Sequence, residues 1–479
     1  MKVYCEATSS AYLINPPAYQ GIKIVREGRC MQRKGAWTAV WAPVSLATIA
    51  AVLENEGFKV KLDDCIVNEI DADKLQKKLE IFKPDLVVIN TATPSIVTDL
   101  KVASLAKKAN PNCVTVAFGI HVTALPEESL KMEKNLDAVV RGEPEMTIKE
   151  VALKMREGEG LTKVRGITFK KGRRIIRNLD RPPIENLDVL PFPAWQHIKI
   201  GRHLMPFKNI PFLLVATGRG CPYQCNFCAD KTFYGRKLRL RSPKRIVDEL
   251  EWIGKKFRVK DFLFWSESFT INRQFAKSVA EEIIRRRLKV HWVCNSRVDT
   301  VDYNLLKKFA QAGCWMIGYG IESGEQRILN LMNKRTTLKQ AKKAVGDAHR
   351  AGLEVTGHCV IGYPGETKKT IQKTIEFAKN LGLDFVQFYC AVPFPGSELY
   401  VVAKEKGWLT TEDWPFFEQN FSVVNTPQLK AQEVMALRRQ AFRDFYLRPK
   451  IIWQTIKRIR SFGDLKQFFW MVKDFITWI

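Results

Sequence analysis

The sequence of 479 residues lacks the features that mark several special classes of protein. No apolar run with a cleavage-type end follows Met1–Ser10, and the longest apolar stretch, Trp41–Leu53, is too short to cross a bilayer. The eleven cysteines are an odd number and mostly isolated, which does not fit a disulfide framework. Internal repeats and low-complexity tracts are also missing. We therefore expect a cytoplasmic globular protein.

Positive charge is what the sequence has in excess. It has 77 Lys and Arg against 50 Asp and Glu, a net charge of +27, in a chain that is otherwise ordinary at 46% hydrophobic residues. The length corresponds to about three domains of usual size. Such a charge suits nucleic acid, an anionic lipid surface or an acidic substrate. It equally fits a solvated surface without a partner, so charge alone does not choose a function.

The first third of the chain alternates short apolar runs with amphipathic helical stretches. We expect helices at 44–57 and 71–82, and strands at the following segments: 11–17, 58–64, 85–90, 113–119 and 136–143. Repeated strand–helix units of this kind predict an α/β, Rossmann-like, doubly wound parallel sheet that binds ligands at the carboxyl ends of its strands. Residues 156–207 are rich in proline and charge, which predicts a linker.

A second α/β series follows. Strands are expected at 211–217, 261–265, 291–295, 315–321, 354–361 and 384–389, with helical stretches between them. Six strand–helix units are too few for a closed eightfold barrel, so we expect a partial, open (βα)6 barrel of the TIM type. The predicted domains are therefore 1–155, the linker 156–207, 208–425 and a helical C-terminal region at 426–479.

Three cysteines differ from the others in their spacing. Cys221, Cys225 and Cys228 lie in GRGCPYQCNFCAD, a C-x3-C-x2-C loop directly after a predicted strand. Three thiolates on one short loop can bind three irons of a four-iron cluster, which leaves the fourth iron open to a chelating ligand. A structural zinc site would need a fourth ligand nearby, and the next candidates are His291 and Cys294. Zinc or simple buried cysteines remain the alternatives.

The loop resembles the signature of the radical S-adenosylmethionine (SAM) enzymes. Five further segments are similar to family motifs: WSESF at 265–269 (with Ser266-Glu267 departing from the usual acidic pair), CNSRVD at 294–299, YGIESGEQRIL at 319–329, GHCVIGYPGET at 357–367 and VPFPGSELY at 392–400. The resemblance implies a [4Fe-4S] cluster on the three cysteines, SAM at the open iron, and an electron donor such as flavodoxin or ferredoxin. A 5′-deoxyadenosyl radical would then take hydrogen from an unactivated carbon. The implied SAM contacts are Phe227, Glu267, Arg297, Glu322, Gly362 and Pro364.

The first domain resembles the cobalamin-binding module of one radical SAM subclass, which includes class B methylases, the anaerobic magnesium-protoporphyrin monomethyl ester cyclase and hopanoid-associated relatives. The similar segments are LINPP, TATPSIVTD, FGIHVTALPEE and RGEPE. They imply cobalamin contacts for Thr93, Ser95, Gly119, His121, Gly142 and Glu143. A D-x-H-x-x-G motif is missing from the sequence. The cobalt would then lack a protein histidine ligand, unless His121 supplies one, or the domain is a remnant.

The C-terminal segment 443–479 interleaves aromatic and aliphatic residues with Lys and Arg at helical spacing. It predicts basic amphipathic helices that lie on an anionic membrane face, contact a hydrophobic substrate or pack on the barrel. Together with the resemblance, this implies cobalamin-dependent C-methylation of a hydrophobic, lipid-like or polycyclic small molecule. A cyclase or rearrangement without methyl transfer is the first alternative. A nucleic-acid modifying enzyme is the second, and the lack of a recognisable RNA-binding module disfavours it.

Overall fold

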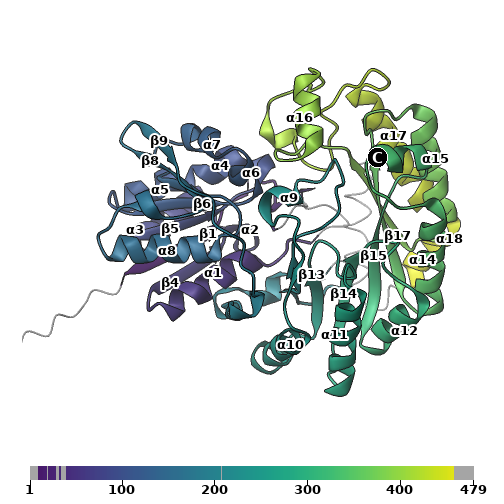
Figure 1. The fold of residues 1–479 in the computed structure, drawn as a ribbon, viewed down its shortest axis with the longest axis horizontal. Coiled ribbons are helices and arrows are strands. Elements are labelled where there is room, and N and C mark those ends of the chain that lie inside the picture. The colour runs from purple at the N-terminus through teal and green to yellow at the C-terminus, as the bar shows by residue number, and fades with distance from the viewer. Residues whose placement is uncertain (1–8, 19, 28–31, 34–38, 206–207, 458–479) are drawn as a thin grey trace, which may run out of the picture. The chain divides into compact units, whose positions relative to one another are not determined.

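The computed structural model describes residues 9–18, 20–27, 32–33, 39–205 and 208–457 (Figure 1). The chain forms two compact units. The first comprises the chain up to residue 31, residues 40–202 and residues 232–235, and the second comprises 32–39, 203–231 and the chain from 236 onward. Each unit has its own sheet and its own core, so each is described separately.

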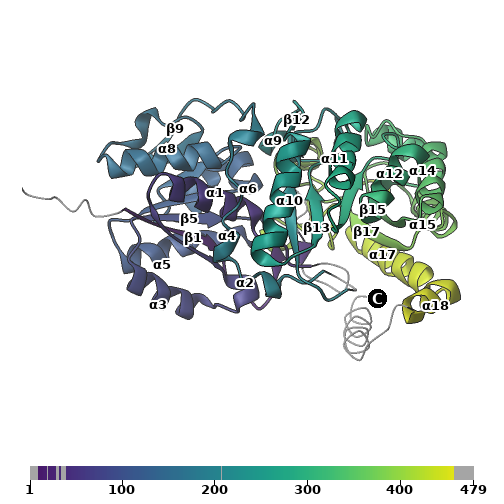
Figure 2. The same ribbon diagram turned by 90° about the horizontal axis from the view of Figure 1, so that it is seen from below.

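The first unit contains a seven-stranded sheet in the order β4-β1-β5-β6-β7-β8-β9. Its first five strands are parallel: β4 (Lys59–Asp64), β1 (Ser10–Asn15), β5 (Leu86–Asn90), β6 (Val114–Phe118) and β7 (Ala138–Val140). Helices α1 (Val44–Asn55) and α8 (Glu145–Arg156) lie on one face, and α3 (Ala72–Phe82) and α5 (Val102–Ala109) lie on the other (Figure 2). The central strands are almost wholly buried because helices cover both faces. The doubly wound α/β prediction is confirmed.

The segment expected to be a linker, 156–207, contributes to this sheet. Strands β8 (Ile167–Lys171) and β9 (Arg174–Arg177) form an antiparallel hairpin, and β8 pairs antiparallel with β7. Gly172, at φ +59°, forms the turn between them. The segment is charged because an edge hairpin keeps solvated side chains. We expected a linker because the same charge is typical of segments without regular structure.

The second unit contains six parallel strands in the order β10-β13-β14-β15-β16-β17. They are β10 (Phe212–Ala216), β13 (Asp261–Trp265), β14 (His291–Ser296), β15 (Cys314–Glu322), β16 (Glu354–Ile361) and β17 (Phe385–Cys390). Outside the arc of strands lie α10 (Pro243–Phe257), α11 (Arg273–Arg285), α12 (Tyr303–Gln311), α14 (Leu338–Arg350) and α15 (Lys368–Asn380) (Figure 1). The first and last strands do not pair, so the partial (βα)6 barrel is confirmed.

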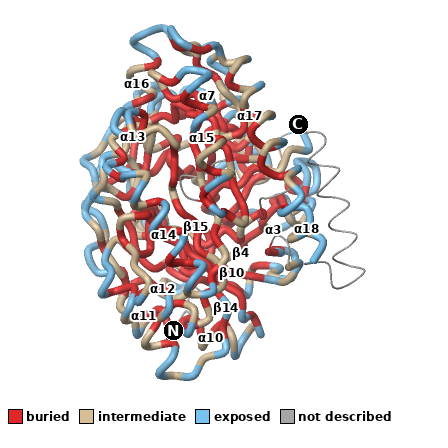
Figure 3. The backbone as a smooth tube through the Cα atoms, turned by 90° about the vertical axis from the view of Figure 1, so that its right-hand side faces the viewer, coloured by how far each residue is buried: buried red, intermediate tan, exposed pale blue. Residues whose placement is uncertain are grey.

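The C-terminal region begins with a helix that packs on the barrel. In α17 (Ala431–Tyr446), the Tyr446 hydroxyl donates to the Val386 carbonyl at 2.8 Å and accepts from the Val386 amide at 3.0 Å. The following helix, α18 (Pro449–Lys457), leaves Trp453 58% exposed. The rest of the segment predicted to form basic amphipathic helices, with its aromatic residues Phe469 and Trp470, lies outside the described residues. Among the described helices, none combines the length and hydropathy needed to cross a membrane. Figure 3 shows exposed backbone concentrated at the periphery, around buried strands.

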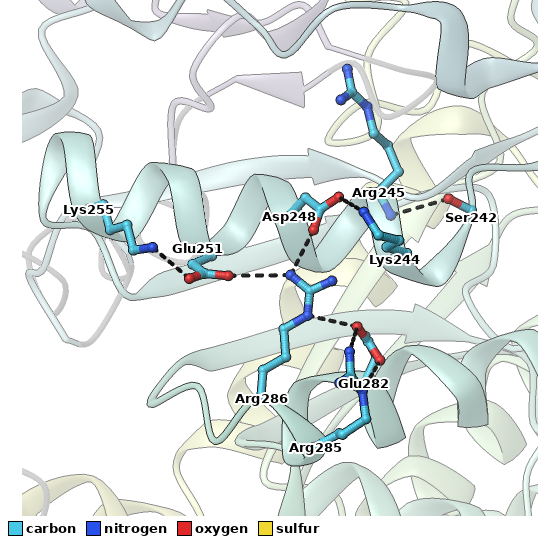
Figure 4. Close-up of polar contacts among 9 residues, drawn as sticks. All are labelled: Ser242, Lys244, Arg245, Asp248, Glu251, Lys255, Glu282, Arg285 and Arg286. Atoms are coloured by element: carbon cyan, nitrogen blue, oxygen red, sulfur yellow. Dashed lines mark hydrogen bonds and ion pairs between the residues drawn. The ribbon is translucent and has the colours of Figure 1, made fainter.

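An ion-pair network joins α10 to α11 (Figure 4). The Arg286 guanidinium lies 2.7 Å from Asp248, 3.3 Å from Glu251 and 2.7 Å from Glu282. Hydrogen bonds from Arg285 lower the pKa of Glu282 from 4.5 to about 2, although partial burial opposes the shift and Arg286 adds to it. A carboxylate whose pKa is depressed by folding stabilises the folded state above its unfolded pKa and loses that contribution as pH falls.

We expect Arg286→Met, which keeps the aliphatic stem, to lower the apparent Tm by about 2–4 °C at pH 7. The difference from the unmodified protein should shrink as the pH falls from 4.5 toward 2, where Glu282 becomes protonated. Thermal melts across that pH range measure both effects. Lys307→Met, on the exposed face of α12, is the control, and an equal loss of Tm in both variants would contradict the network's role.

Candidate functional site

The three-cysteine loop follows β10 at the carboxyl edge of the barrel strands. Backbone and amide hydrogen bonds hold it in place. The Asn226 amide donates to the Met332 carbonyl at 3.1 Å, and the Asn226 carbonyl accepts from the Leu399 amide at 3.0 Å. The Asn333 side chain donates to the Gln224 carbonyl at 2.9 Å. Segments far apart in the sequence therefore fix the loop's position.

The environment of these cysteines differs from that of the others. Cys221, Cys225 and Cys228 are half-buried, whereas every other cysteine in the described part of the chain is buried. Burial raises the pKa of the Cys113 thiol to about 11 and that of Cys390 to about 12, which disfavours the thiolate that binds metal. Within the described residues, no three His, Cys, Asp or Glu side chains are placed to hold a single metal ion. Three accessible thiols on one loop fit a four-iron cluster, because each sulfur binds a different iron.

Lys334 contacts both Glu322 and Arg297, the two residues expected to contact SAM. Glu322 ends β15 with φ +61°, a left-handed conformation that a residue other than glycine adopts only at a cost. Its carboxylate lies 2.5 Å from Nζ of the buried Lys334. Arg297 donates to the Lys334 carbonyl at 2.8 Å and stacks its guanidinium 3.6 Å from the ring centroid of Tyr223, within the cysteine loop. Sequence reasoning missed Lys334, which follows β15 only after a helix.

Phe227 packs against a small apolar cluster whose members are Ile328, Met332, Val360, Tyr363, Ala391 and Leu399. Tyr363 stands between Gly362 and Pro364, so the structure brings the expected aromatic residue to the expected loop. Glu366 accepts hydrogen bonds from the amides of Gly362 at 2.6 Å and Tyr363 at 3.1 Å, which fixes the turn after β16. Burial raises the pKa of Glu366 to about 8.

The remaining expected SAM residue, Glu267, is buried just after β13 at the same carboxyl edge. Between buried neighbours on β14, β16 and β17, the polar side chains of Asn295, His358 and Tyr389 stay partly accessible. The Tyr389 hydroxyl lies 3.4 Å from His358 Nδ1. A Cβ at Gly318 would lie 2.4 Å from Asn295 Oδ1 and 2.9 Å from His358 Nε2. Sequence reasoning missed this cluster, although polar residues inside apolar strands and the glycines of GYG were signals for it.

Gly320 offers a test of the Glu322–Lys334 pair. A Cβ there would lie 2.5 Å from Glu322 Oε1 and 2.6 Å from Lys334 Nζ. We expect Gly320→Ala to displace the pair and to weaken SAM binding about tenfold, or about 1.4 kcal/mol. Calorimetric titration of SAM into reconstituted protein measures this. Gly346→Ala, on α14 with nothing within 4 Å of its added Cβ, is the control. Unchanged SAM affinity in Gly320→Ala would contradict a SAM-binding role for the pair.

In the first unit, the residues expected to contact cobalamin gather at the carboxyl edge of three adjacent strands. Thr93 and Ser95 follow β5, Gly119 and His121 follow β6, and Gly142 and Glu143 follow β7. Because β5, β6 and β7 are parallel neighbours, these six residues share one edge of the sheet. The structure therefore brings together what the sequence placed on three separate loops.

The same edge has features that fit a polar, nucleotide-like ligand. Gly119 has φ +140°, and a Cβ there would lie 2.5 Å from the Thr91 carbonyl oxygen, so only glycine fits. Asn15 Oδ1 and Asn90 Nδ2, at the ends of β1 and β5, are buried and have no hydrogen-bond partner among the described residues. Buried polar groups of this kind are usually satisfied by a ligand or ordered water. The residues present thus fit a cobalamin tail at this edge.

His121 is completely buried in α6 (Ile120–Ala124), with Nδ1 3.4 Å from the Thr93 hydroxyl. Burial lowers its pKa to about 3, so the ring is neutral at physiological pH. A role as cobalt ligand stays a prediction, and it would require a ring that is enclosed by protein here to reach the metal.

A buried ion pair that sequence reasoning did not identify supports this edge. Arg26 and Asp99 are in contact at 2.7 Å, and both side chains are almost fully buried. Asp99 accepts from the Ser95 hydroxyl at 2.8 Å, while Arg26 donates to the Pro16 carbonyl at 3.1 Å. The pair therefore ties the loop after β1 to the loop after β5. No local motif signals it, because the partners are 73 residues apart.

Comparison with known proteins agrees with the division into two α/β domains. Residues 215–378 match the radical SAM superfamily, and residues 36–152 match the B12 binding domain. An uncharacterized methyltransferase of Pyrococcus horikoshii is 32% identical over 414 residues, covering 86% of this chain and 90% of that protein. The anaerobic magnesium-protoporphyrin IX monomethyl ester cyclase of Rubrivivax gelatinosus is 31% identical, covering 80% and 69%.

Among solved structures, the radical S-adenosylmethionine methyltransferase TsrM of Kitasatospora setae, with cobalamin and a [4Fe-4S] cluster bound, superposes with a TM-score of 0.68. It is 17% identical, covering 85% of this chain and 76% of that one, and shows a shared fold. Three observations lead to one conclusion. The open six-stranded barrel has the cysteine loop, the first unit has polar loops at the carboxyl ends of adjacent strands, and the sequence similarity covers most of the chain. The chain belongs to the radical SAM superfamily of enzymes, in the group that joins the radical SAM barrel to a B12-binding domain.

Proposed function

We propose that the protein methylates an unactivated carbon of a small molecule, using SAM, a [4Fe-4S] cluster and cobalamin. The observation that carries the proposal is that one chain combines a three-thiol loop on a radical SAM barrel with a sheet edge whose loops fit cobalamin. The chain is also similar over 86% of its length to an uncharacterized methyltransferase. The division into functional domains at 1–155, 208–425 and 426–479 is part of the proposal, with the hairpin at 167–177 added to the first domain's sheet.

In this proposal each group of residues has a defined task. Cys221, Cys225 and Cys228 hold the cluster, which together with SAM supplies a radical able to take hydrogen from an inert carbon. Lys334 orients the Glu322 carboxylate, and Phe227 packs against the apolar cluster beside the turn at Gly362. Apolar packing of this kind keeps water away from a reactive intermediate.

The edge of the first unit performs the second task. Thr93, Ser95, Gly119, Gly142 and Glu143 would hold cobalamin, and cobalamin would supply the methyl group to the substrate radical. The buried Arg26–Asp99 pair keeps two of the loops in place. The partly accessible Asn295, His358 and Tyr389 are the candidates for contacts to the substrate.

A cyclase or rearrangement activity is the second candidate, favoured by the 31% identity to the anaerobic cyclase. The two candidates differ in how they consume SAM. A methylase uses one SAM for the methyl group and one for the radical, so S-adenosylhomocysteine and 5′-deoxyadenosine should form in equal amounts. A cyclase should form 5′-deoxyadenosine without S-adenosylhomocysteine.

The test is an anaerobic assay of reconstituted protein with dithionite, hydroxocobalamin, SAM carrying a labelled methyl group, and lipid and pigment extract from cells that lack the gene. Mass spectrometry should find the label in a new extract component, with the two SAM products in equal yield. Formation of 5′-deoxyadenosine alone, together with an unlabelled new product, would favour the cyclase. If neither label nor new product appears with any extract, the methylase proposal fails.

We also propose that the substrate is hydrophobic, lipid-like or polycyclic, and that the C-terminal region contacts the inner face of a membrane peripherally. Ile452, Trp453 and Ile456 on α18 are exposed, and the lysines Lys450 and Lys457 lie on the same helix. Exposed apolar side chains combined with basic ones are typical of an interfacial helix. The net charge of +27 favours an anionic surface.

Removing residues 451–479 should release the protein from anionic vesicles and leave SAM cleavage largely intact, because α17 with its Tyr446 contact remains. Each basic residue near an anionic surface contributes about 1 kcal/mol, so vesicle binding should also weaken with salt. Vesicle flotation measures binding. Ile456→Ser should weaken it, whereas Ile81→Ser, at an exposed position of α3, should not. Vesicle binding that survives the truncation would contradict the membrane proposal.

A further inference from the structure

The last strand of the barrel presents different side chains to its two faces. On β17, Phe388 is buried against Phe442 of α17, with the two ring centroids 5.6 Å apart. Gln387 and Tyr389, its neighbours on either side, stay partly accessible. Since successive side chains of a strand point to opposite faces, Gln387 and Tyr389 lie on the face away from α17. This face is the inner face of the arc of strands (Figure 1).

The inner face of the neighbouring strands is also polar. On β14, Trp292 is buried with its ring centroid 5.1 Å from that of Phe309 on α12, so Asn295, three residues later, lies on the inner face. The partly accessible residues of this face include Asn295, Met316, Thr356, His358, Gln387 and Tyr389. Five of these six side chains are polar. A substrate that covers polar groups must supply hydrogen bonds to them, because a polar group that loses its water without a new partner costs free energy.

Three of these residues, Asn295, His358 and Tyr389, gather around a glycine, and we call them the inner cluster. Gly318 on β15 pairs in the sheet with Asn295 on β14. A Cβ at Gly318 would lie 2.4 Å from Asn295 Oδ1 and 2.9 Å from His358 Nε2. The lack of a side chain at Gly318 therefore leaves room for two polar atoms from two different strands to approach one point.

The atoms of the inner cluster have defined hydrogen-bonding abilities. Asn295 Oδ1 only accepts, so it would repel a carboxylate oxygen placed beside it. The Tyr389 hydroxyl lies 3.4 Å from His358 Nδ1, and the planes of the two stacked rings differ by 12°. When this hydroxyl donates to Nδ1, the imidazole carries its proton on Nε2. A hydroxyl group of a ligand matches both atoms, because it can accept from Nε2 and donate to Oδ1 at the same time.

The inner cluster lies beside the residues expected to contact SAM. Gly320, two residues after Gly318, pairs with His358 in the sheet. A Cβ at Gly320 would lie 2.5 Å from Glu322 Oε1 and 2.6 Å from Lys334 Nζ. A group held above Gly318 would therefore lie next to the side of the barrel where the radical is expected to form.

We propose that the substrate carries a hydroxyl group and that the inner cluster binds this group above Gly318. His358 donates Nε2–H to the hydroxyl oxygen, and Asn295 accepts a hydrogen bond from the hydroxyl. Tyr389 is a positioning residue, because it orients the imidazole through Nδ1. The inference rests on the proposed function, from which it takes a small-molecule substrate, and it adds the group by which the site selects that molecule.

Chemical blocking of a cell extract tests this substrate class. Lipid and pigment extract from cells that lack the gene is divided into an untreated portion, a portion acetylated on its hydroxyl groups and a portion methyl-esterified on its carboxyl groups. Acetylation should lower label transfer from methyl-labelled SAM at least about tenfold, because a site that hydrogen-bonds a hydroxyl discriminates strongly against a substrate without one. Esterification should leave transfer within about twofold, since Asn295 Oδ1 does not bind a carboxylate. Mild alkaline hydrolysis, which removes acetyl groups from oxygen and not from nitrogen, should restore the transfer.

Variants of the inner cluster test the same contact from the side of the protein. His358→Phe keeps a ring without nitrogens and should raise the extract concentration that gives half-maximal transfer about five- to tenfold, as expected for the loss of one neutral hydrogen bond. His358→Gln, which keeps a donor and an acceptor, should recover most of this affinity. Asn295→Leu is a second variant of similar volume, and the iron content after reconstitution checks that each variant folds. His349→Phe makes the same exchange on α14, outside the arc of strands, and should leave the half-maximal concentration unchanged.

A binding measurement separates this inference from the proposed function. Immobilised protein without SAM is incubated with untreated extract, and mass spectrometry before and after acetylation counts the hydroxyl groups of each retained component. We expect a retained component that carries a hydroxyl group and that His358→Phe and Asn295→Leu both fail to retain. Such retention without label transfer would contradict the proposed methylation and support the inference.

Other results would overturn the inference and leave the methylase proposal standing. They are label transfer to acetylated extract at the untreated rate, a labelled product without a hydroxyl group, and retention and transfer that are the same in both cluster variants as in the unmodified protein. A component whose retention is lost on esterification and kept on acetylation would overturn it as well, because the recognised group would then be a carboxyl. Retention of no extract component by the unmodified protein would also count against it.

Discussion

Replacing Cys225 with alanine is expected to remove the [4Fe-4S] cluster and to abolish the formation of 5′-deoxyadenosine from SAM and dithionite. Cys225 is the middle cysteine of a loop that offers three half-buried thiols, and two thiols cannot hold a four-iron cluster with a single open iron. Iron and sulfide analysis, the visible absorbance of the cluster and product chromatography measure the effect. Normal SAM cleavage by this variant would refute the assignment of the cluster.

The chain supplies matched controls for this experiment. Cys113→Ala and Cys390→Ala remove thiols whose pKa values burial raises to about 11 and about 12, and Cys314 is also buried. Removing a small buried side chain costs about 1 kcal/mol or somewhat more in stability and should leave the iron content unchanged. If Cys113→Ala lost iron as Cys225→Ala does, the loss would reflect general unfolding.

Replacing Gly119 with valine is expected to remove cobalamin binding and methyl transfer while leaving radical formation at the cysteine loop intact. A Cβ at this position would lie 2.5 Å from the Thr91 carbonyl oxygen and 2.6 Å from its hydroxyl, at a φ that valine strongly disfavours. The loop after β6 must therefore move. We expect bound hydroxocobalamin to fall from about one equivalent to below about one tenth, and methyl transfer to fall at least ~100-fold. Radical formation at the cysteine loop, measured as 5′-deoxyadenosine, should stay within about twofold.

Gly158→Val is the control for this prediction. Gly158 also has a positive φ, at +70°, but nothing lies within 4 Å of its added Cβ. It should retain cobalamin, although the backbone strain lowers stability by about 1–3 kcal/mol. Gel filtration followed by absorbance spectroscopy measures retention. Full cobalamin retention in Gly119→Val would show that the edge after β6 does not hold the cofactor.

Local sequence patterns were sufficient to predict the two α/β folds. Parallel strands buried on both faces appear as short apolar runs, and DLVVIN and CVTVAFG became β5 and β6 because helices cover both sides. The hairpin β8–β9 was mistaken for part of a linker, since the residues of a half-solvated edge look like a charged connector when read alone. Gly172, which forms the turn of the hairpin, was the signal from which two strands could have been predicted.

By itself, the sequence determined the elements whose chemistry is local: the three thiols within eight residues, and the loops that follow individual strands. Tertiary structure alone decided which distant groups meet. Lys334 pairs with Glu322, and Arg26 pairs with Asp99 across 73 residues. Asn295 and His358, on two different strands, both approach the space that the missing side chain of Gly318 leaves free on the strand between them. The physical reason is that a local pattern records the preferences of neighbouring residues. A buried ion pair or a cleared space depends instead on the order of strands in the sheet, which brings the carboxyl ends of separate strands to one edge.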